Sequence, residues 1–206
     1  MVLINILLVD DHTLFAKSLS IALEEYDEIE QFYSTQDVHN LSEVIVDKRI
    51  DIVLMDINLK DLSEYDGLKV AYNLLKINPT IKIIMLTGYD LPVYKYEAKK
   101  IGICGFLNKN ISPDSLIDSL LKVYQGKTCF TSENDEIIIE DLTSMEKKIL
   151  QLICSGKKRK VIADELYISE RTLSNHLQHI YDKLDVSSSV EAITKAIQMG
   201  YISPIY

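Results

Sequence analysis

The chain has 206 residues, 47% of them hydrophobic, and its 31 acidic side chains outnumber its 22 lysines and arginines, for a formal net charge of −9 at pH 7. No apolar run reaches the roughly 20 residues that cross a bilayer, and the three cysteines lack CxxC spacing, so we expect a cytoplasmic protein with reduced thiols and no membrane partner. Residues 1–139 hold 13 basic and 22 acidic side chains, which argues against nucleic-acid binding there, whereas residues 140–206 hold nine of each and leave it open.

Apolar segments alternate with segments of helical spacing through the first part of the chain. The predicted strands are residues 2–9, 28–33, 51–57, 81–87 and 103–108, and the predicted helices are residues 13–25, 37–48, 67–77, 91–101 and 112–125. This alternation predicts an α/β domain with a five-stranded parallel sheet and helices on both faces. Such doubly wound sheets bind ligands in the crevice outside the carboxyl ends of their strands.

Chemically active side chains follow four of the predicted strands. Residues 52–59 form an apolar run that carries a single carboxylate, Asp56, and the other polar groups at strand ends are Asp10, Asp11, Thr87 and Lys109. Three carboxylates in one crevice repel each other unless a cation joins them, and Mg²⁺ prefers oxygen ligands. A hydroxyl and an ammonium group would bind phosphoryl oxygens, which makes Asp56 a candidate nucleophile for phosphoryl transfer.

Each of these residues also has an ordinary interpretation. An aspartate pair after a strand is often a helix cap, a threonine at a strand end often reflects β propensity, and a lysine before a loop is usually solvated. Singly, these interpretations are the better ones. The occurrence of all five at the carboxyl ends of strands favours a functional site.

Residues 1 to about 126 resemble the receiver domain of two-component response regulators. The resemblance is carried by Asp10-Asp11-His12, Met55-Asp56-Ile57-Asn58, Asp66-Gly67, Thr87-Gly88 and Phe106-Leu107-Asn108-Lys109. It implies a flavodoxin-like fold in which Asp56 accepts phosphate from a sensor histidine kinase. It also implies that Mg²⁺ is held by Asp10, Asp11, Asp56 and the backbone carbonyl of Asn58. Thr87 and Phe106 would be a switch pair, with the hydroxyl drawn to the phosphoryl group and the ring turning inward, and Lys109 would bind the phosphoryl group.

The chain departs from this family's usual pattern near the acceptor. Lys60 stands where the family usually has proline, and the segment Lys60–Tyr65 makes the following loop about three residues longer. Lys109 is followed by Asn110 instead of the common proline. The longer acidic loop could alter kinase docking or the lifetime of the phosphate. Residues 55–59 and 86–89 are similar to the competence and quorum-response branch of these regulators.

Residues 127–141 are polar and acidic except for Ile137–Ile139, and we expect a linker there, with the isoleucines packed on one of the domains.

Thr143-Ser-Met-Glu146 predicts a capping box on a helix whose apolar face is Met145, Ile149, Leu152 and Ile153. A short helix over about residues 159–166 and a helix of about residues 170–183 capped by Ser169 follow, and a last helix covers about residues 190–199. The third helix has an apolar stripe of Leu173, Leu177, Ile180 and Leu184, which we expect to be core. Two short helices with a tight turn predict a helix-turn-helix.

About residues 140–200 resemble the tetrahelical DNA-binding domain of the NarL/FixJ (LuxR-type) regulators. The match runs through Leu142–Glu146, Gly156, Arg159–Ala163, Leu166, Ile168-Ser169, Arg171–His176, Ile180 and Lys183–Val186. We therefore expect residues 1–126 to be the receiver domain, 127–141 the linker and 142–206 the DNA-binding domain. Together the two resemblances imply a transcription factor that, when phosphorylated, forms a homodimer on double-stranded promoter DNA.

The candidate DNA contacts fall in two groups. A basic run of Lys157, Lys158, Arg159 and Lys160 could reach phosphates, although such a run is usually a solvated loop. On the third helix, Asn175 and Gln178 could contact base edges or simply be exposed surface. The other candidates on this helix are Arg171, Thr172, Ser174, His176 and Lys183. The family often has lysine at Ser174 and Asn-Arg at Ser188-Ser189. His176 and His179 have no third metal ligand in the pattern.

Two alternatives remain open from the sequence. An aspartyl-phosphate phosphatase also uses Mg²⁺ and an aspartate nucleophile, but it needs a second acid where this chain has Asn58. A phosphorylation-independent DNA-binding regulator would use the receiver only as a dimerisation scaffold, and such a scaffold needs none of the five polar residues at the strand ends. We therefore expect no enzyme activity beyond that of a phosphoacceptor.

Overall fold

The computed structural model describes residues 3–59, 66–88, 91–130 and 140–202. Its contacts divide the chain into two compact units, one built on a sheet and one helical, and each is described by itself. Within the described residues, no helix is both long and apolar enough to cross a membrane. The predicted Lys60–Tyr65 loop and the three isoleucines of the predicted linker lie outside these residues.

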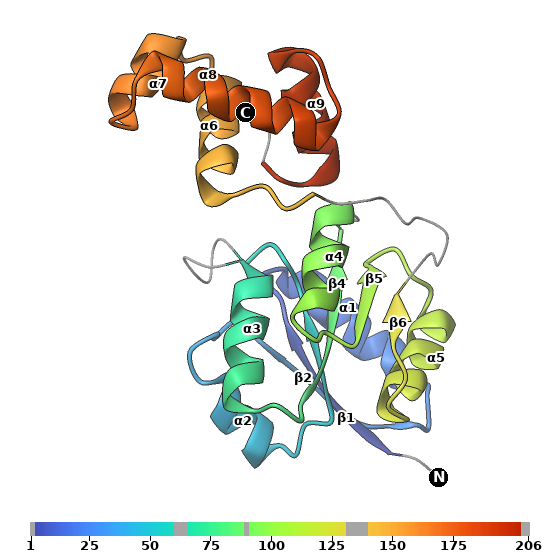
Figure 1. The fold of residues 1–206 in the computed structure, drawn as a ribbon. Coiled ribbons are helices and arrows are strands. Elements are labelled where there is room, and N and C mark those ends of the chain that lie inside the picture. Colours follow the sequence, from blue (N-terminus) through green and yellow to red (C-terminus); the bar gives the residue numbers. More distant parts are fainter. Residues whose placement is uncertain (1–2, 60–65, 89–90, 131–139, 203–206) are drawn as a thin grey trace. The chain divides into compact units, whose positions relative to one another are not determined.

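Six parallel strands form the sheet of the first unit in the order β2-β1-β3-β4-β5-β6 (Figure 1). Their bounds are β1 Ile4–Val9, β2 Ile29–Thr35, β3 Ile52–Met55, β4 Lys82–Thr87, β5 Gly105–Asn108 and β6 Cys129–Phe130. The five predicted strands are confirmed. The order reverses at β1, which lies between β2 and β3, and this is where parallel sheets open a crevice at their carboxyl ends.

The short strand β6 is an addition to the predicted sheet, because its two residues were assigned to the linker. The Cys129 N–H donates a hydrogen bond of 2.9 Å to the Cys104 carbonyl, and Cys129 is paired in register with Gly105. A Cβ atom at Gly105 would lie 2.2 Å from the Cys129 sulfur, so a glycine is needed for this close approach. A strand of two residues has no detectable period, which is why the sequence pattern missed it.

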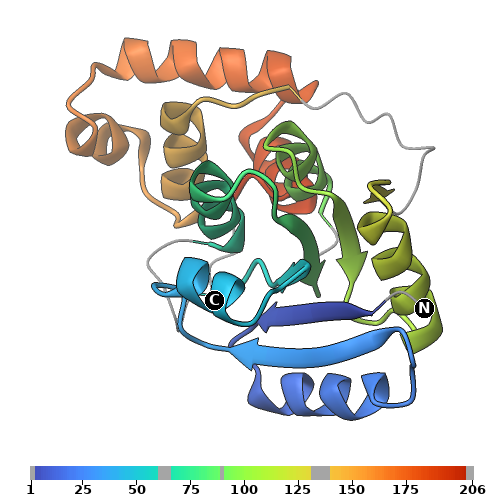
Figure 2. The same cartoon turned by 90° about the horizontal axis from the view of Figure 1, so that it is seen from below.

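Five helices cover the two faces of the sheet, with bounds α1 Thr13–Leu23, α2 Leu41–Asp47, α3 Gly67–Ile77, α4 Pro92–Lys100 and α5 Pro113–Tyr124. Buried residues of α1 and α5 belong to one core cluster, and buried residues of α2, α3 and α4 belong to the other. Figure 2 shows α1 (blue) and α2 (cyan) on opposite sides of the strands. The doubly wound architecture is therefore confirmed.

The central strands supply both cores because successive side chains point to opposite faces. On β1, Leu7 and Val9 enter the core with α2 and α3, and Ile6 and Leu8 enter the core with α1 and α5. All four residues of β3 are buried, as expected for a strand covered on both faces. The carboxylate of Asp56 comes directly after this buried strand.

The helix α2 begins four residues later than predicted, at Leu41. The Asp37 carboxylate accepts hydrogen bonds of 2.8 Å from the His39 N–H and 2.8 Å from the Asn40 side-chain amide. This local turn offers the backbone an alternative to the first helical turn. The start of α2 therefore moves to the residue after the turn.

The helix α3 approaches the backbone next to Asp56 closely. A Cβ atom at Gly67 would lie 1.8 Å from the Asp56 carbonyl oxygen, so the chain can pass here only with glycine. The Ile57 carbonyl accepts hydrogen bonds from the Gly67 N–H at 2.8 Å and from the Leu59 N–H at 3.2 Å. Asp66 caps the helix by accepting a bond of 2.9 Å from the Lys69 N–H. These contacts fix the segment that carries the acceptor.

The second unit has four helices among its described residues, with bounds α6 Ser144–Cys154, α7 Arg159–Glu165, α8 Glu170–Leu184 and α9 Ser189–Met199. The predicted stripe is confirmed, because Leu173, Leu177, Ile180 and Leu184 are all buried. Ser169 caps α8 by accepting a bond of 3.1 Å from the Thr172 N–H. The helices α7 and α8 form the predicted helix-turn-helix.

The predicted apolar face of α6 is partly wrong. Met145 is 37% exposed, whereas Leu150 is buried and was not predicted to be. The capping box explains the difference, because Glu146 is itself buried and turns its side of the helix inward. The Glu146 N–H bonds to the Thr143 hydroxyl at 3.2 Å, and the Thr143 N–H bonds to the Glu146 carboxylate at 2.7 Å. The inward face thus runs through residues 146, 149 and 150.

Candidate functional site

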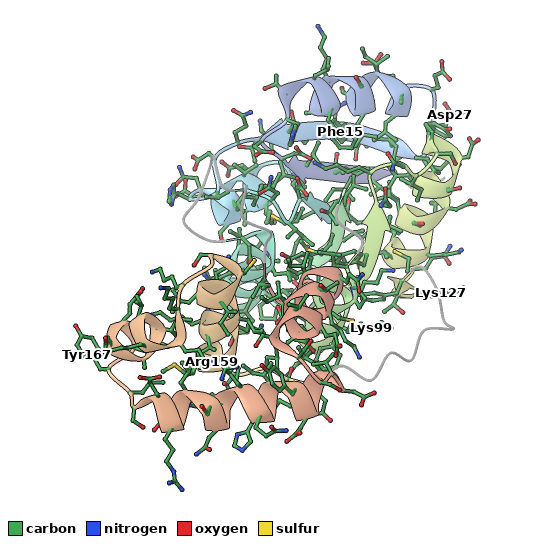
Figure 3. The ribbon with its side chains drawn as sticks, turned by 90° about the horizontal axis from the view of Figure 1, so that it is seen from above. Phe15, Asp27, Lys99, Lys127, Arg159 and Tyr167 are labelled. Carbon is green, nitrogen blue, oxygen red and sulfur yellow. The ribbon has the colours of Figure 1, made fainter. Side chains whose placement is uncertain are left out.

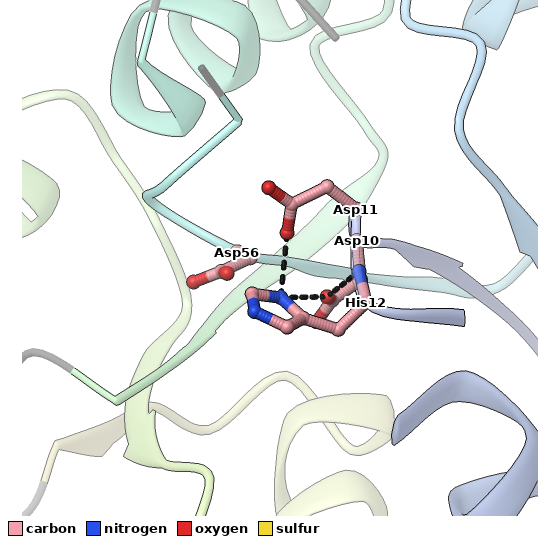
Figure 4. Close-up of side chains that lie close together, drawn as sticks. All are labelled: Asp10, Asp11, His12 and Asp56. Carbon is pink, nitrogen blue, oxygen red and sulfur yellow. Dashed lines mark hydrogen bonds and ion pairs between the residues drawn. The ribbon is translucent and has the colours of Figure 1, made fainter. Parts of the chain in front are cut away.

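The carboxyl ends of β1 and β3 bring three carboxylates together. Asp10 and Asp11 follow β1 and Asp56 follows β3, and one ligand atom from each lies within 4.8 Å of the others, together with a nitrogen of His12 (Figure 4). Asp10 is 3% exposed and Asp56 is 2% exposed. Unpaired charges this deeply buried would be unstable, so the crevice must supply them with partners.

Lys109 is the cation that joins two of these carboxylates. Its ammonium nitrogen lies 2.7 Å from an oxygen of Asp10 and 2.7 Å from an oxygen of Asp56. Burial opposes its charge, but the hydrogen bonds to Asp10 and Asp56 outweigh burial, and the pKa of Lys109 is raised above its usual value. Lys109 is therefore an ammonium ion at neutral pH, placed where it can bind an anion attached to Asp56.

Asp56 is held by two donors. One carboxylate oxygen accepts a hydrogen bond of 2.7 Å from the Ile57 N–H, and the other accepts one of 2.7 Å from the Lys109 ammonium. A carboxylate held in this way, at the edge of the sheet and next to a cation, has the surroundings of a nucleophile for phosphoryl transfer.

Thr87 and Phe106 lie on the neighbouring strands and are both fully buried. Thr87 ends β4, and its carbonyl accepts a hydrogen bond of 2.9 Å from the Lys109 N–H. Phe106 lies in β5 in register with Met85, and the Lys95 ammonium is 6.0 Å from the centroid of its ring. The ring that the sequence comparison expects to turn inward is already inside in this structure.

The crevice also fits a divalent cation. Asp10 Oδ2 and Asp11 Oδ1 are buried oxygens whose partners are the Lys109 ammonium at 2.7 Å and His12 Nδ1 at 2.6 Å. Carboxylate oxygens are the ligands that Mg²⁺ prefers. Asn58, two residues after Asp56, is partly exposed, and the ligand role of its carbonyl stays a prediction.

His12 belongs to the Asp10-Asp11-His12 motif, but the sequence pattern indicates no role for its side chain. The structure places its ring against both aspartates that follow β1, with Nδ1 2.6 Å from Asp11 Oδ1 and 3.2 Å from Asp10 Oδ1 (Figure 4). His12 is the N-cap of α1, yet its side chain makes no capping bond. Histidine is a poor choice at a position where serine, threonine, aspartate or asparagine is preferred, and this was the available signal.

In the helical unit, the candidate DNA contacts of α8 share one outward surface. Arg171, Thr172, Ser174, Asn175 and Gln178 are exposed, and His176 is half-buried. Two of the exposed residues have partners on the same helix: the Ser174 hydroxyl donates to the Glu170 carbonyl at 2.9 Å, and the Gln178 amide donates to Asp182 at 2.9 Å. The basic residues at positions 157–160 are exposed, and Lys157 is paired with Glu165.

Lys183, the last candidate DNA contact, is bonded to other residues of the helical unit. Its ammonium lies 2.8 Å from the buried Glu146 carboxylate and 3.1 Å from the Asp141 carbonyl. Burial opposes the charge of Glu146, but the hydrogen bonds from Lys183 and Thr143 outweigh burial and lower the pKa of the Glu146 carboxyl. A DNA contact by Lys183 would have to compete with this pair.

The turn between α7 and α8 holds a large exposed side chain. Tyr167 has φ +55°, a left-handed conformation that favours glycine or asparagine, and it is 96% exposed. Figure 3 shows its ring at the edge of the helix-turn-helix, pointing away from the unit that carries it.

Comparison with known proteins agrees with this geometry. Residues 6–121 match the response regulator receiver domain, and residues 140–196 match the bacterial regulatory proteins of the luxR family. The transcriptional regulatory protein MctR of Rhizobium johnstonii is 30% identical over 98% of this chain and 97% of its own length. The transcriptional regulatory protein DesR of Bacillus subtilis is 29% identical over 97% of this chain and 99% of its own length.

Solved structures have the same architecture. The response regulator ChrA of a heme-sensing two-component system is 28% identical and covers 98% of this chain and 100% of its own, with a TM-score of 0.54. An RcsB–DNA complex is 22% identical and covers 95% of this chain and 98% of its own, with a TM-score of 0.68, a likeness of fold. The chain belongs to the NarL/FixJ family of response regulators, DNA-binding transcriptional regulators with a receiver domain followed by a LuxR-type helix-turn-helix domain, and not to a family of enzymes.

Proposed function

We propose that Asp56 accepts a phosphoryl group from a sensor histidine kinase, with Mg²⁺ as cofactor, and that this modification promotes homodimerisation and sequence-specific binding to promoter DNA in the cytoplasm. A receiver domain implies a histidine kinase partner, and a LuxR-type domain binds DNA. The observation that carries the proposal is the position of Lys109, 2.7 Å from both Asp10 and Asp56. From this position the Lys109 ammonium would form an ion pair with a phosphoryl group attached to Asp56.

In the transfer step, a carboxylate oxygen of Asp56 attacks the phosphorus of a phosphohistidine. The new P–O bond forms as the P–N bond breaks, and the imidazole nitrogen of the kinase keeps the electron pair. Mg²⁺ held by Asp10, Asp11, Asp56 and the Asn58 carbonyl would offset the charge of the phosphoryl oxygens. The Lys109 ammonium then follows the negative charge from the carboxylate to the phosphoryl group.

The response to phosphorylation passes through the end of β4. The backbone N–H of Lys109 donates a hydrogen bond of 2.9 Å to the Thr87 carbonyl. A displacement of either residue would therefore displace the other. We propose that the Thr87 hydroxyl binds the phosphoryl group and that the buried ring of Phe106 keeps this arrangement closed. Phosphorylation would then shift the population toward a form in which Thr87 and Phe106 are drawn toward the phosphoryl group, and this form pairs with a second copy.

DNA recognition falls to α8. Its outward residues offer one guanidinium, that of Arg171, for a phosphate or a guanine, and two side-chain amides, those of Asn175 and Gln178, for base edges. The exposed lysines 157, 158 and 160 at the entrance of α7 supply phosphate contacts, and Thr172, Ser174 and His176 complete the proposed surface. A homodimer would present two such helices to symmetric half-sites.

The test compares Asp56→Asn with Asp47→Asn, which removes an exposed carboxylate at the end of α2. Each protein is incubated with acetyl phosphate and Mg²⁺, intact mass reports the phosphoryl adduct, and sedimentation reports dimerisation. Binding is measured on sites obtained by random-site selection with the phosphorylated protein. We expect the adduct, the dimer and tight DNA binding in the wild type and in Asp47→Asn, and none of them in Asp56→Asn.

Other outcomes would favour the alternatives. Equal dimerisation and DNA binding with and without the phosphodonor, and equal behaviour of Asp56→Asn, would favour a receiver that serves only as a scaffold. Steady turnover of a phosphate ester would favour a phosphatase. The presence of Asn58 instead of an acid two residues after the nucleophile argues against turnover.

A further inference from the structure

His12 brings a nitrogen ligand into the acidic crevice. Its Nδ1 atom contacts two different carboxylates, at 2.6 Å from Asp11 and 3.2 Å from Asp10 (Figure 4). The side chain of Asp10 is fully buried and that of Asp11 is 8% exposed, whereas the ring of His12 is 61% exposed. One nitrogen at the mouth of the crevice therefore faces the two carboxylates that follow β1.

The backbone holds the ring in this place. The His12 N–H donates a hydrogen bond of 2.9 Å to Asp10, so the turn that leads from β1 into α1 is closed by the same carboxylate that the ring touches. His12 has an extended backbone, with φ −88° and ψ 92°, and its ring makes no capping bond to α1. The ring is thus directed at the aspartates instead of being used for the helix.

Carboxylate oxygens and one imidazole nitrogen converge in the crevice. One ligand atom from each of Asp10, Asp11, His12 and Asp56 falls within 4.8 Å of the others, and the partner of the buried Asp11 Oδ1 is the His12 nitrogen itself. In this structure the His12 nitrogen lies beside the two carboxylates, at 2.6 Å from Asp11 and 3.2 Å from Asp10. A divalent ion that binds among these groups can take Nδ1 of a neutral imidazole as a ligand together with the carboxylate oxygens.

We infer that His12 is a metal ligand of this site and that it gives the site a preference for divalent transition metals, with Mn²⁺ as the test ion, over Mg²⁺. This inference rests on the proposed function, because it concerns the same crevice. Oxygen ligands alone suit Mg²⁺ and Mn²⁺, whereas an imidazole nitrogen binds transition metals well and Mg²⁺ poorly. Lys109, 2.7 Å from Asp10, limits the affinity for both ions, so the contribution of His12 is the change in the Mn²⁺ to Mg²⁺ affinity ratio when His12 is replaced.

The experiment uses the full-length protein without a phosphodonor. Mn²⁺ bound to the wild type is examined by electron spin-echo modulation, which detects a directly coordinated nitrogen, and Mn²⁺ and Mg²⁺ affinities are measured by calorimetry. The variants are His12→Asn, which places a favourable N-cap residue at this position, His12→Ala, and the control His179→Ala, which removes an exposed imidazole from α8. Circular dichroism confirms that each variant is folded.

We expect nitrogen modulation in the wild type and in His179→Ala, and its loss in both His12 variants. The Mn²⁺ affinity should fall on the order of tenfold in these variants, with a much smaller change for Mg²⁺. Absence of nitrogen modulation in the wild type, or its survival in His12→Asn, would overturn the inference. The proposed function is tested separately by the phosphoryl adduct on Asp56. The metal-ligand role of His12 and the phosphorylation of Asp56 can therefore be refuted independently of each other.

Discussion

The acidic crevice and the outward face of α8 are both polar surfaces, but they are built in opposite ways. In the crevice, charged groups from three strand ends contact one another: the buried Asp10 and Asp56 and the partly buried Lys109 form one network. On α8, Arg171, Ser174, Asn175 and Gln178 come from one helix and are exposed, and the bonds of Ser174 and Gln178 go to residues of that same helix. Removing a charge from the crevice should therefore cost stability, whereas removing one from α8 should cost only DNA affinity.

The largest effect is expected from Lys109→Met. Without the ammonium, the buried carboxylates of Asp10 and Asp56 face each other unpaired, and we expect the free energy of unfolding to fall by about 3 kcal/mol. Added Mg²⁺ should restore part of this loss, because a divalent ion replaces the missing cation. Urea unfolding followed by circular dichroism, with and without Mg²⁺, measures both effects.

The matched control is Lys122→Met, which removes an exposed ammonium from α5. We expect it to change the free energy of unfolding by at most about 0.5 kcal/mol and to show no Mg²⁺ rescue. Equal losses in the two variants would mean that the crevice network does not stabilise the receiver unit, and the contrast with α8 would disappear.

A smaller loss is expected from Glu146→Ala, because the helical unit also has one buried ion pair. The change removes the capping box of α6 and the partner of Lys183, and we expect the free energy of unfolding to fall by about 2 kcal/mol. Glu146→Gln keeps a side-chain oxygen for the cap and should lose about half as much. Lys148→Ala, an exposed position on the same helix, is the control, and similar values for all three would refute the assignment.

The Glu146 pair also predicts a pH dependence with a definite sign. The pKa of this carboxyl is lower in the folded state than its ordinary value of 4.5, so the unfolded chain takes up a proton first as the pH falls. The stabilisation is fully present above pH 4.5 and is lost as the pH falls through the folded-state value. The wild type and Glu146→Gln should converge in stability in this acidic range, and a constant difference between them would contradict the prediction.

On α8 the effects should appear in DNA binding. Asn175→Ala should relax the preference at one base position by about 1 kcal/mol, whereas Arg171→Ala, if its contact is a phosphate, should weaken binding to all sequences and reduce the salt dependence by about one ion. Both variants should unfold within about 0.5 kcal/mol of the wild type. Binding assays at several salt concentrations on matched and mismatched sites check this, and a large stability loss in either variant would place these residues in the fold instead.

The smallest expected effect is an increase in stability. Asparagine tolerates the left-handed conformation of Tyr167 better than tyrosine, and little burial is lost at a residue that is 96% exposed, so Tyr167→Asn should stabilise the helical unit by about 0.5 kcal/mol. Tyr167→Ala keeps the unfavourable backbone conformation and should show no gain. Thermal unfolding of the two variants separates them, and an equal shift in both would rule out backbone strain as the cause.

The two regions also differ in how far the sequence could predict them. Strand ends of a parallel sheet meet at one edge, so the encounter of Asp10, Asp11 and Asp56 follows from the alternation of strands and helices alone. The ion pair between Glu146 and Lys183 joins residues 37 positions apart on different helices. The periodicity of a single helix cannot predict such a long-range contact. The inward position of Leu150 accompanies this contact, because Glu146 and Leu150 lie on the same buried side of α6.

Short and local features limited the prediction in the sheet as well. The strand β6 has only two residues, and the start of α2 is set by side-chain bonds of Asp37 that compete with the helix. The direction of the His12 ring could not be predicted from a cap position alone. The buried position of the Phe106 ring is a choice of side-chain conformation, which the sequence pattern does not specify.

The two hydrogen bonds to the Ile57 carbonyl have a consequence for protein engineering. Because Leu59 and Gly67 both donate to this one oxygen, they bring together the two ends of the segment that separates them. The cost of closing a longer segment grows slowly with its length, since each doubling adds about 0.6 kcal/mol. A peptide tag or a reporter can therefore be inserted after Lys60 while the backbone around Asp56 keeps its position.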